Sequence, residues 1–520
     1  MQQWESMTNG HSEIVIVGGG HNGLVAATYL ARAGHQVTVL EGRSELGGAV
    51  ASAQIFQGVA VRLSRFSYLV SLLPDLIIEE LGLRLELRSR PVRSFTPVDE
   101  TGLIVERQEG RLTRDSFRSL TGTEREYQAW VAFQDNLHKL AAVIEPTLTQ
   151  PLPHIDELRS RVDPWLWASV VARPLGELVE STFSDDTVRG LVLTDALIGT
   201  FSWAHDPSLR QNRCFLYHVI GKGSGEWKVP VGGMGAITAE LVRVAQEANV
   251  SIRTGCLVEA IEPLPSGGGT LRLTNDESIT AEMILANCAP ATLQRLLGEP
   301  QGSPVGSQTK INIVLRRLPQ LRSGVEPTIG FAGTLHLGQG YGRLQQAYQE
   351  ALQGEIPDPM PCEVYCHTLT DGSILDPELR AAGYHTLTLF GMHTPSNLFT
   401  ADPEGSRERA KAAALRSLRS VLAEPLEPCL ALDRRGEPCI EVMTPLDIEA
   451  ELGMPGGNIF HGDLAWPWLA EDATATTAAE RWGVATDHPG ILLCGSGAVR
   501  GGAVSGLGGH NAAMAVLEDD

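Results

Sequence analysis

Residues 14–23 read Ile-Val-Ile-Val-Gly-Gly-Gly-His-Asn-Gly, an apolar run that ends in glycines. Small residues then recur at helical spacing from Asn22 to Ala33, Gly34 ends that pattern, and a second strand-like run covers Gln36 to Glu41. Strand, glycine-rich turn, helix and strand in this order make a βαβ unit, and Gly18 to Gly23 has the G-x-G-x-x-G spacing. We therefore predict an α/β fold that contains a Rossmann-type dinucleotide-binding domain.

Each residue of this unit has a predicted task. Gly18 makes the turn, Gly20 lets the backbone reach a pyrophosphate at the helix N-terminus beside Asn22, and Gly23 allows close packing of helix and strand. Glu41 lies 23 residues after Gly18, where a carboxylate can accept both ribose hydroxyls and would repel a 2′-phosphate. The alternative for Glu41 is an ordinary solvated acid at a strand end. The first interpretation predicts an unphosphorylated adenosine.

A second glycine pair follows the βαβ unit. Gly47 and Gly48 precede Ala49, and Arg43 lies four residues before them. Glycines at this place let the chain bend back over a pyrophosphate, with Arg43 nearby. The doublet separates FAD binders from NAD binders, so the predicted cofactor is FAD.

Residues 14–49 resemble the FAD-binding start of the phytoene dehydrogenase-related and flavin amine oxidase superfamily. Residues 63–69, 231–236 and 495–498 resemble, more narrowly, the group called pyridine nucleotide-disulfide oxidoreductase domain-containing protein 2, and the likeness extends over nearly the whole chain. The group's name suggests a redox dithiol. Neither C-x-x-C nor C-x-x-x-x-C follows the dinucleotide motif here, so a disulfide reductase mechanism is not expected.

The resemblance implies further cofactor contacts. Val258 is expected to send backbone toward the adenine, and Asn287 begins the N-x-x-P segment that ends a strand near the cofactor. The alternative for Asn287 is a plain strand-ending turn. Gly495, Val504 and Ser505 belong to the closing segment that resembles the superfamily's second flavin contact, where a helix N-terminus would stabilise negative charge on a reduced flavin.

The candidate catalytic residues are His218 and Lys310. His218 could accept a proton near neutral pH, and the alternative is a structural histidine on a helix face. Amine oxidases often place a lysine by water near the flavin N5, and the alternative for Lys310 is a solvated lysine at a strand end. Cys494 and His510 flank the closing loop, but ordinary packing is favoured for both, so FAD is expected to bind noncovalently. Arg500 stands where the group has a proline, which could alter the path of the loop or add a positive charge near the flavin.

The length of 520 residues favours more than one domain. Residues 1–12 are predicted to be a flexible tail. Residues 13–95, 226–300 and 484–520 are predicted to form a discontinuous FAD-binding domain of the glutathione-reductase or amine-oxidase kind. Residues 96–225, with longer helical patterns, and 301–483, with alternating strands, are predicted to form an α+β substrate domain in which a mixed sheet roofs a cavity.

Composition limits the partners. Acidic residues number 62 and basic residues 41, so the net charge of -21 disfavours nucleic acid. No apolar stretch is long enough to span a membrane, although residues 164–171 could line an apolar tunnel or rest on a membrane surface; core packing is favoured for them. Eight scattered cysteines favour reduced thiols and a cytoplasmic location. No metal site is predicted, and the oligomeric state stays open.

Together these features predict an FAD-dependent oxidoreductase, a dehydrogenase or oxidase, that transfers a hydride from a small organic or apolar substrate to the flavin N5. A carotenoid-type desaturase or isomerase is an alternative that rests on the superfamily resemblance. A flavin-containing regulatory or scaffold protein is an alternative of another class, because fold does not decide chemistry. The substrate and the electron acceptor stay open.

Overall fold

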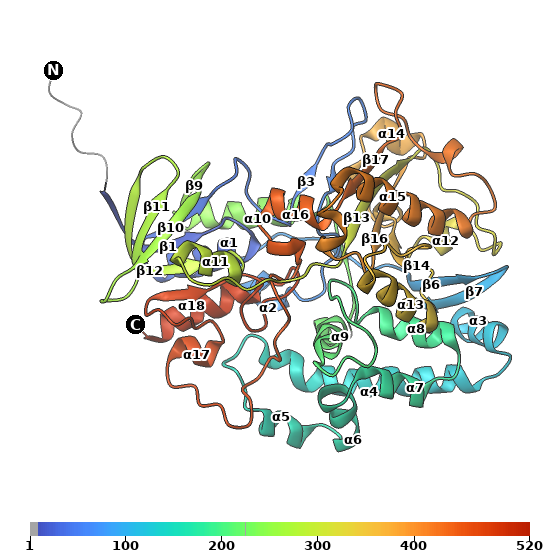
Figure 1. Ribbon diagram of the computed structural model, residues 1–520, viewed down its shortest axis with the longest axis horizontal. Helices are drawn as coiled ribbons and strands as arrows, with labels where there is room; N and C mark the ends of the chain where they lie inside the picture. The colour runs from blue at the N-terminus through green and yellow to red at the C-terminus, as the bar shows by residue number, and fades with distance from the viewer. Residues whose placement is uncertain (1–8, 224, 520) are drawn as a thin grey trace.

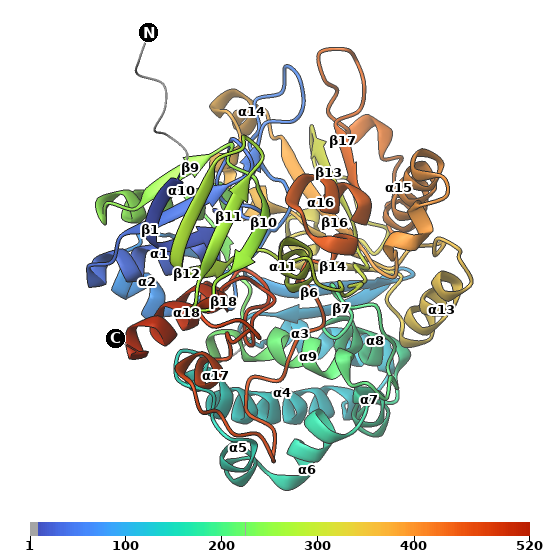
Figure 2. The same ribbon diagram turned by 60° about the vertical axis from the view of Figure 1, so that its left-hand side comes forward.

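A computed structural model describes residues 9–223 and 225–519. It contains two seven-stranded sheets and two short two-stranded ones. Figure 1 shows the first sheet at the left with α1 and α18 beside it, and the second sheet at the right. Helices α4, α5, α6, α7 and α9 lie together below the second sheet, and Figure 2 shows the same arrangement after rotation.

The first sheet has the order β10-β11-β12-β1-β2-β9, with β18 paired to β12. The pairs β12-β1, β1-β2, β2-β9 and β12-β18 are parallel, and β10-β11 and β11-β12 are antiparallel. The strands are β1 (Asn9–Val17), β2 (Val37–Glu41), β9 (Ser251–Thr254), β10 (Val258–Pro263), β11 (Gly269–Leu273), β12 (Ser278–Ala286) and β18 (Ile491–Leu493).

Helices from three distant parts of the sequence cover this sheet. They are α1 (His21–Ala33), α10 (Met234–Glu247) and α18 (Leu507–Asp519). Ile16 of β1, Leu24 of α1, Leu241 of α10 and Ala512 of α18 belong to one buried apolar cluster. Burial of this shared apolar surface is what holds the N-terminal strand, the middle of the chain and the C-terminal helix together.

The second sheet has the order β17-β13-β16-β15-β14-β6-β7. Only its β14-β6 pair is parallel among the described strands. Its strands are β6 (Val92–Val98), β7 (Thr101–Glu106), β13 (Thr309–Leu315), β14 (Thr334–Leu337), β15 (Cys362–Tyr365), β16 (His385–Gly391) and β17 (Ile440–Met443). All seven residues of β13 are buried, as expected for a central strand with both faces covered.

The remaining helices and strands connect or cover the sheets. They are β3 (Ser52–Ala53), β4 (Leu63–Ser64), β5 (Leu87–Arg88), β8 (Val229–Pro230), α2 (Asp75–Leu81), α3 (Arg111–Thr121), α4 (Arg125–Ile144), α5 (Ile155–Arg161), α6 (Pro164–Trp167), α7 (Leu175–Thr182), α8 (Asp186–Thr194), α9 (Arg210–Ile220), α11 (Pro290–Leu297), α12 (Pro327–Gly330), α13 (Tyr341–Leu352), α14 (Pro377–Ala381), α15 (Pro403–Ser420), α16 (Pro445–Leu452) and α17 (Ala478–Trp482).

The predicted α/β fold with a Rossmann-type unit is confirmed. The predicted tail over 1–12 is wrong for residues 9–12, because β1 begins at Asn9 through parallel pairing with Ser278; residues 1–8 lie outside the described part. The boundary predicted between 95 and 96 falls inside β6, and β6 and β7 occupy the start of a region predicted to be helical. The division into two domains stays a prediction.

The segment around residues 164–171 is mostly core: Leu166 and Trp167 are buried, while Trp165 is 55% exposed. Among the described residues, no helix is both long and apolar enough to cross a membrane. Association with a membrane surface and a cytoplasmic location stay predictions. The eight cysteines are free thiols, and no group of His, Cys, Asp and Glu within residues 9–223 and 225–519 could hold a metal ion.

Candidate active site

A cavity of about 580 Å³ extends from the ends of β1 and β2 to the strands of the second sheet. Most of the predicted cofactor residues line it. These are Gly18, Gly20, Asn22, Glu41, Arg43, Gly47, Gly48, Ala49, Val258, Asn287 and Val504. Gly23, Gly495 and Ser505 do not line it. The carboxyl ends of parallel strands, where β1 and β2 end, are the usual binding edge of such a sheet.

The turn after β1 is tightly built. Gly18 has a φ of 104°, which favours glycine, and its carbonyl oxygen accepts a hydrogen bond from Asn287 Nδ2 at 2.9 Å. The Asn287 backbone N–H also donates to the Val17 oxygen at 2.9 Å. A Cβ atom on Gly23 would lie 2.4 Å from the Gly18 oxygen. Gly23 therefore lets α1 rest on the turn, and Asn287 holds the turn from β12.

The N-terminus of α1 can receive an anion. Gly20 is its N-cap, no side chain caps it, and its first turn holds no acidic residue. The backbone N–H groups of such a turn lack partners within the helix, and the helix dipole favours negative charge there. Asn22 is 1% exposed, and its Oδ1 has no hydrogen-bond partner. The uncapped N–H groups and the absence of an acid from the first turn fit a pyrophosphate, whereas the Asn22 oxygen can only accept and needs a donor.

Glu41 is already fixed by the backbone. One carboxylate oxygen accepts from the Gly19 N–H at 2.8 Å and the other accepts from the Arg43 N–H at 2.9 Å. Two backbone donors therefore hold the carboxylate at the strand end, and its contact with a ribose stays a prediction. The Gly47 N–H donates to the Gly19 oxygen at 2.9 Å, so the second glycine pair lies on the first turn.

Val504 of the closing loop lines the cavity, and other residues of this loop pack against the residues that line it. Ser505 is buried, and its Oγ accepts from the Leu507 N–H at 3.2 Å, at the start of α18. A Cβ atom on Gly495 would lie 3.2 Å from the Asn287 carbonyl carbon, so this glycine permits close packing behind the site. Direct cofactor contacts by Gly495 and Ser505 stay predictions.

The expectation that Arg500 adds charge near the flavin is not supported by its position. Its guanidinium is buried away from the cavity lining and donates to the carbonyl oxygens of Thr147 at 2.8 Å and Gln150 at 2.5 Å. A third bond runs to the Trp482 oxygen at 3.1 Å. Arg500 ties the closing loop to the helical layer below the second sheet.

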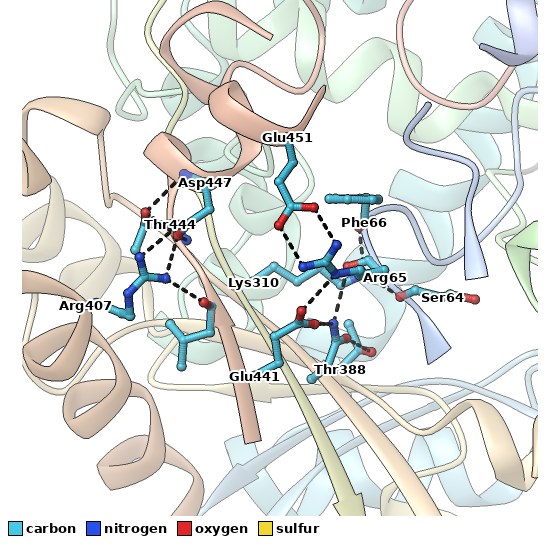
Figure 3. A network of polar contacts seen from close by, with 12 residues as sticks. Ser64, Arg65, Phe66, Lys310, Thr388, Arg407, Glu441, Thr444, Asp447 and Glu451 are labelled. Atoms are coloured by element: carbon cyan, nitrogen blue, oxygen red, sulfur yellow. Dashed lines mark hydrogen bonds and ion pairs between the residues drawn. The ribbon is translucent and has the colours of Figure 1, made fainter. Parts of the chain in front are cut away.

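Lys310 is a buried residue of the cavity wall. It is 2% exposed, so the alternative of a solvated strand-end lysine is wrong. Its Nζ donates to the carbonyl oxygens of Ser64 at 2.8 Å and Phe66 at 2.7 Å, as Figure 3 shows, and a longer contact reaches the Ser67 oxygen. Burial lowers the pKa of Lys310 to about 7. Its catalytic role stays a prediction.

His218 lies on α9 and also lines the cavity. Its Nδ1 is 3.3 Å from the Cys214 carbonyl oxygen, and its ring centroid is 5.0 Å from that of Trp227. A carbonyl can only accept, so Nδ1 carries the proton and Nε2 is the acceptor of the neutral ring. Burial lowers the pKa of His218, which keeps it neutral at pH 7. The ring is therefore able to accept a proton.

A polar network next to Lys310 was not predicted. Arg65 donates to Glu441 through Nε at 2.8 Å and to Glu451 through both terminal nitrogens (Figure 3). Asn312 Nδ2 also donates to Glu441, at 2.9 Å. Arg65 lies between Ser64 and Phe66, whose carbonyl oxygens accept from Lys310, so the network ties this segment to β17 and α16. The segment 63–69 carried only a resemblance in the sequence, because its acidic partners lie some 380 residues away.

Residues 23–435 match the family described as flavin containing amine oxidoreductase. The chain belongs to this family. It is 48% identical to an uncharacterised protein of Mycobacterium tuberculosis over 97% of both chains. It is 29% identical to mouse pyridine nucleotide-disulfide oxidoreductase domain-containing protein 2 over 98% of this chain and 93% of that one.

The fold is also found in solved structures. Cyclohexylamine oxidase from Brevibacterium oxydans is similar with a TM-score of 0.58 and 17% identity, over 98% of this chain and 99% of that one. At that identity the likeness concerns the fold alone. Family membership makes the protein a flavin-dependent oxidoreductase, which confirms the predicted class of enzyme.

Proposed function

We propose that the protein binds FAD noncovalently and that an organic substrate gives a hydride to it. The continuous cavity carries this proposal: the glycine turns and Glu41 lie at one end, and Lys310, His218 and aromatic side chains lie at the other. The uncapped start of α1 suits a pyrophosphate, and the fixed Glu41 carboxylate suits ribose hydroxyls. One cavity can thus hold a dinucleotide and a substrate together.

Bound FAD would supply the hydride acceptor, and the chain's own residues would orient the substrate and exclude water. Tyr68 and Tyr365 form part of the wall, with ring centroids 4.9 Å apart, and Phe390 lies edge-on to Tyr365. Lys310 holds the backbone of the loop that carries Tyr68. The Nε2 atom of His218 would accept a proton from the substrate.

Noncovalent binding is supported by the positions of the two candidate attachment residues. Cys494 and His510 are both buried and neither lines the cavity. Acid precipitation of the purified protein tests this directly. Yellow FAD in the supernatant is expected, and flavin that stays with the precipitated chain would show a covalent bond.

A carotenoid-type desaturase or isomerase is supported by the apolar part of the cavity wall, which includes Phe133, Leu137, Phe215 and Leu464. A regulatory or scaffold protein would bind FAD without turnover. The two alternatives differ from the leading proposal in what reduces the flavin: a polyene in the first case and no organic donor in the second.

The test is the visible spectrum of the purified protein, followed by anaerobic mixing with amines, alcohols, hydroxy acids and polyenes. A flavin spectrum that one class of small polar donor bleaches is the expected result. Bleaching only by polyenes would replace the proposal with the desaturase. A flavin that no donor bleaches would favour the scaffold protein, and a protein that neither contains nor takes up FAD would refute the proposal.

A further inference from the structure

Three arginines from one edge of the second sheet meet in the cavity. Arg90 precedes β6, Arg93 lies in it, and Arg107 follows β7; all three line the cavity. The antiparallel register pairs Val92 with Glu106, and the Arg107 N–H donates to the Pro91 oxygen at 3.0 Å. The hairpin therefore brings residues 17 positions apart into one basic group.

The protein leaves this group poorly paired. Arg90 is 4% exposed; its Nη1 donates to the neutral Thr334 hydroxyl at 3.2 Å, and its Nε has no hydrogen-bond partner. Arg93 donates to the neutral Gln134 amide oxygen at 2.7 Å. Buried guanidinium groups are normally paired with carboxylates, because desolvating an unpaired charge is costly.

Arg107 is only loosely neutralised. Its Nε lies 3.7 Å from Glu226 Oε1, and neither of these buried atoms has a hydrogen-bond partner. Burial and the charges of Arg93 and Arg90 lower the pKa of Arg107 to about 10, so it still carries its charge at pH 7. A carboxylate placed between these arginines would complete hydrogen bonds that the protein leaves open.

Glu363, the carboxyl group whose charge acts on Arg90, does not balance the charge of the arginines. Glu363 is 3% exposed, accepts a hydrogen bond from the Tyr365 hydroxyl, and lies 3.8 Å from His336 Nε2. Burial, with the charge of Asp195 adding to it, raises the pKa of Glu363 to about 8. Burial lowers the pKa of His336 to about 3, so that ring is neutral. Glu363 and His336 therefore leave the charge of the arginines in place, and among the described residues only Asp195 and Glu226 are set against the three of them.

Apolar side chains continue the same cavity. Phe133 and Leu137 of α4, Leu191 of α8 and Phe215 of α9 are buried and line it beside the arginines. We infer that the substrate is an organic acid, whose carboxylate binds to Arg90, Arg93 and Arg107 while its apolar body packs against these helices. The inference rests on the proposed function, because it names the substrate class of the same cavity. An amine or a hydrocarbon would leave the arginines unpaired.

Calorimetric titration of the FAD-loaded protein tests the inference with matched probes. These are 4-phenylbutyrate, 4-phenylbutylamine and 4-phenylbutanol, together with decanoate, indole-3-acetate and inorganic phosphate. At least one of the three acids is expected to bind and to perturb the flavin spectrum, while the amine and the alcohol bind about tenfold more weakly or not at all. Failure of all three acids, a preference for the amine, or binding of phosphate without any acid would overturn the inference.

Variants then locate the binding group. Arg90→Met and Arg107→Met are each expected to raise the Kd of the acid that binds by about tenfold or more. Arg107→Lys is expected to raise it less, because lysine keeps the positive charge but lacks the paired N–H donors of the guanidinium group. Arg111→Met is the control, since that side chain is 94% exposed on α3. Acid binding that withstands both cavity variants, or that Arg111→Met weakens equally, would overturn the assignment.

Thermal unfolding separates binding from a structural role. Because no described carboxylate forms a hydrogen bond with Nε of the half-buried Arg107, the unfolding temperature of Arg107→Met should be unchanged or higher while acid binding falls. A large drop in unfolding temperature together with FAD loss would mark Arg107 as structural and refute the inference. A protein that never binds FAD would refute the proposed function, whereas a protein that binds FAD and is bleached by an amine would refute the acid substrate alone.

Discussion

Replacing Gly23 by alanine should weaken the binding of FAD while the protein still folds. The new Cβ atom would lie 2.4 Å from the Gly18 oxygen and 2.7 Å from Asn287 Nδ2. Carbon needs at least about 3.0 Å, so α1 and the turn must separate by about 0.6 Å, the difference between 3.0 and 2.4 Å. Overpacking of this kind costs about 1–3 kcal/mol, partly offset by about 1 kcal/mol of helix propensity.

The cost to FAD should be larger than the cost to folding. The shift moves the N–H groups at the start of α1 and strains the Gly18–Asn287 hydrogen bond. Each charge-assisted hydrogen bond to a pyrophosphate contributes about 1.5–3 kcal/mol, so weakening one or two raises the Kd for FAD roughly tenfold to several hundredfold. Reconstitution of apoprotein, followed by flavin fluorescence, measures this Kd.

Gly34→Ala is the matched control on the same helix. Gly34 ends α1 with a φ of 110°, and no atom lies within 4 Å of the place that a Cβ atom would take, so alanine brings strain of about 1–2 kcal/mol and no collision. It should lower the unfolding free energy and leave the Kd for FAD unchanged. Wild-type affinity in Gly23→Ala, or an equal loss in Gly34→Ala, would refute the role given to Gly23.

Substitutions at three other residues give separate tests. Glu41→Arg should greatly reduce the flavin content of the purified protein and Glu41→Gln should reduce it less, since glutamine can still accept one of the two backbone hydrogen bonds; unchanged flavin in Glu41→Arg would remove Glu41 from the site. Lys310→Met should lower the urea midpoint of unfolding by an amount that corresponds to about 2–4 kcal/mol, because the buried Ser64 and Phe66 carbonyls lose their donor. An unchanged midpoint would show that these hydrogen bonds do not stabilise the fold. Glu363 keeps a proton in the folded state that the unfolded chain releases near pH 4.5, so its contribution to the unfolding free energy should fall from pH 4.5 to about 8. Between pH 4.5 and about 8, the unfolding free energy of Glu363→Gln should rise relative to that of the wild type by up to a few kcal/mol, as measured by urea titrations at each pH. If the unfolding free energies of the two proteins depend on pH in the same way, Glu363 is not a buried, neutral acid.

The start of the chain could be predicted because its signals are local. The spacing of Gly18, Gly20 and Gly23 between two apolar runs specifies a strand, a turn and a helix without reference to the rest of the chain. The start of β1 was missed because Asn9 is held by backbone pairing with Ser278, which no local pattern reports.

The polar groups in and around the cavity wall show the opposite case. Arg65 with Glu441 and Glu451, and Arg90 with Glu363, come from segments hundreds of residues apart. Lys310 was noticed as a strand-end residue, but its burial follows from β13 being an interior strand of the second sheet, between β17 and β16. Local composition cannot indicate which charges will be buried together, because that depends on sheet order and register.

Amino-acid order near the N-terminus thus specifies a dinucleotide-binding turn, since glycine backbone freedom and the strand-helix alternation act over a few residues. The closing glycines and the resemblance of several segments extend that conclusion to a flavoprotein family. Only tertiary structure decides which side chains face the substrate and which charges remain unpaired, because desolvation and pairing depend on neighbours that the fold brings together.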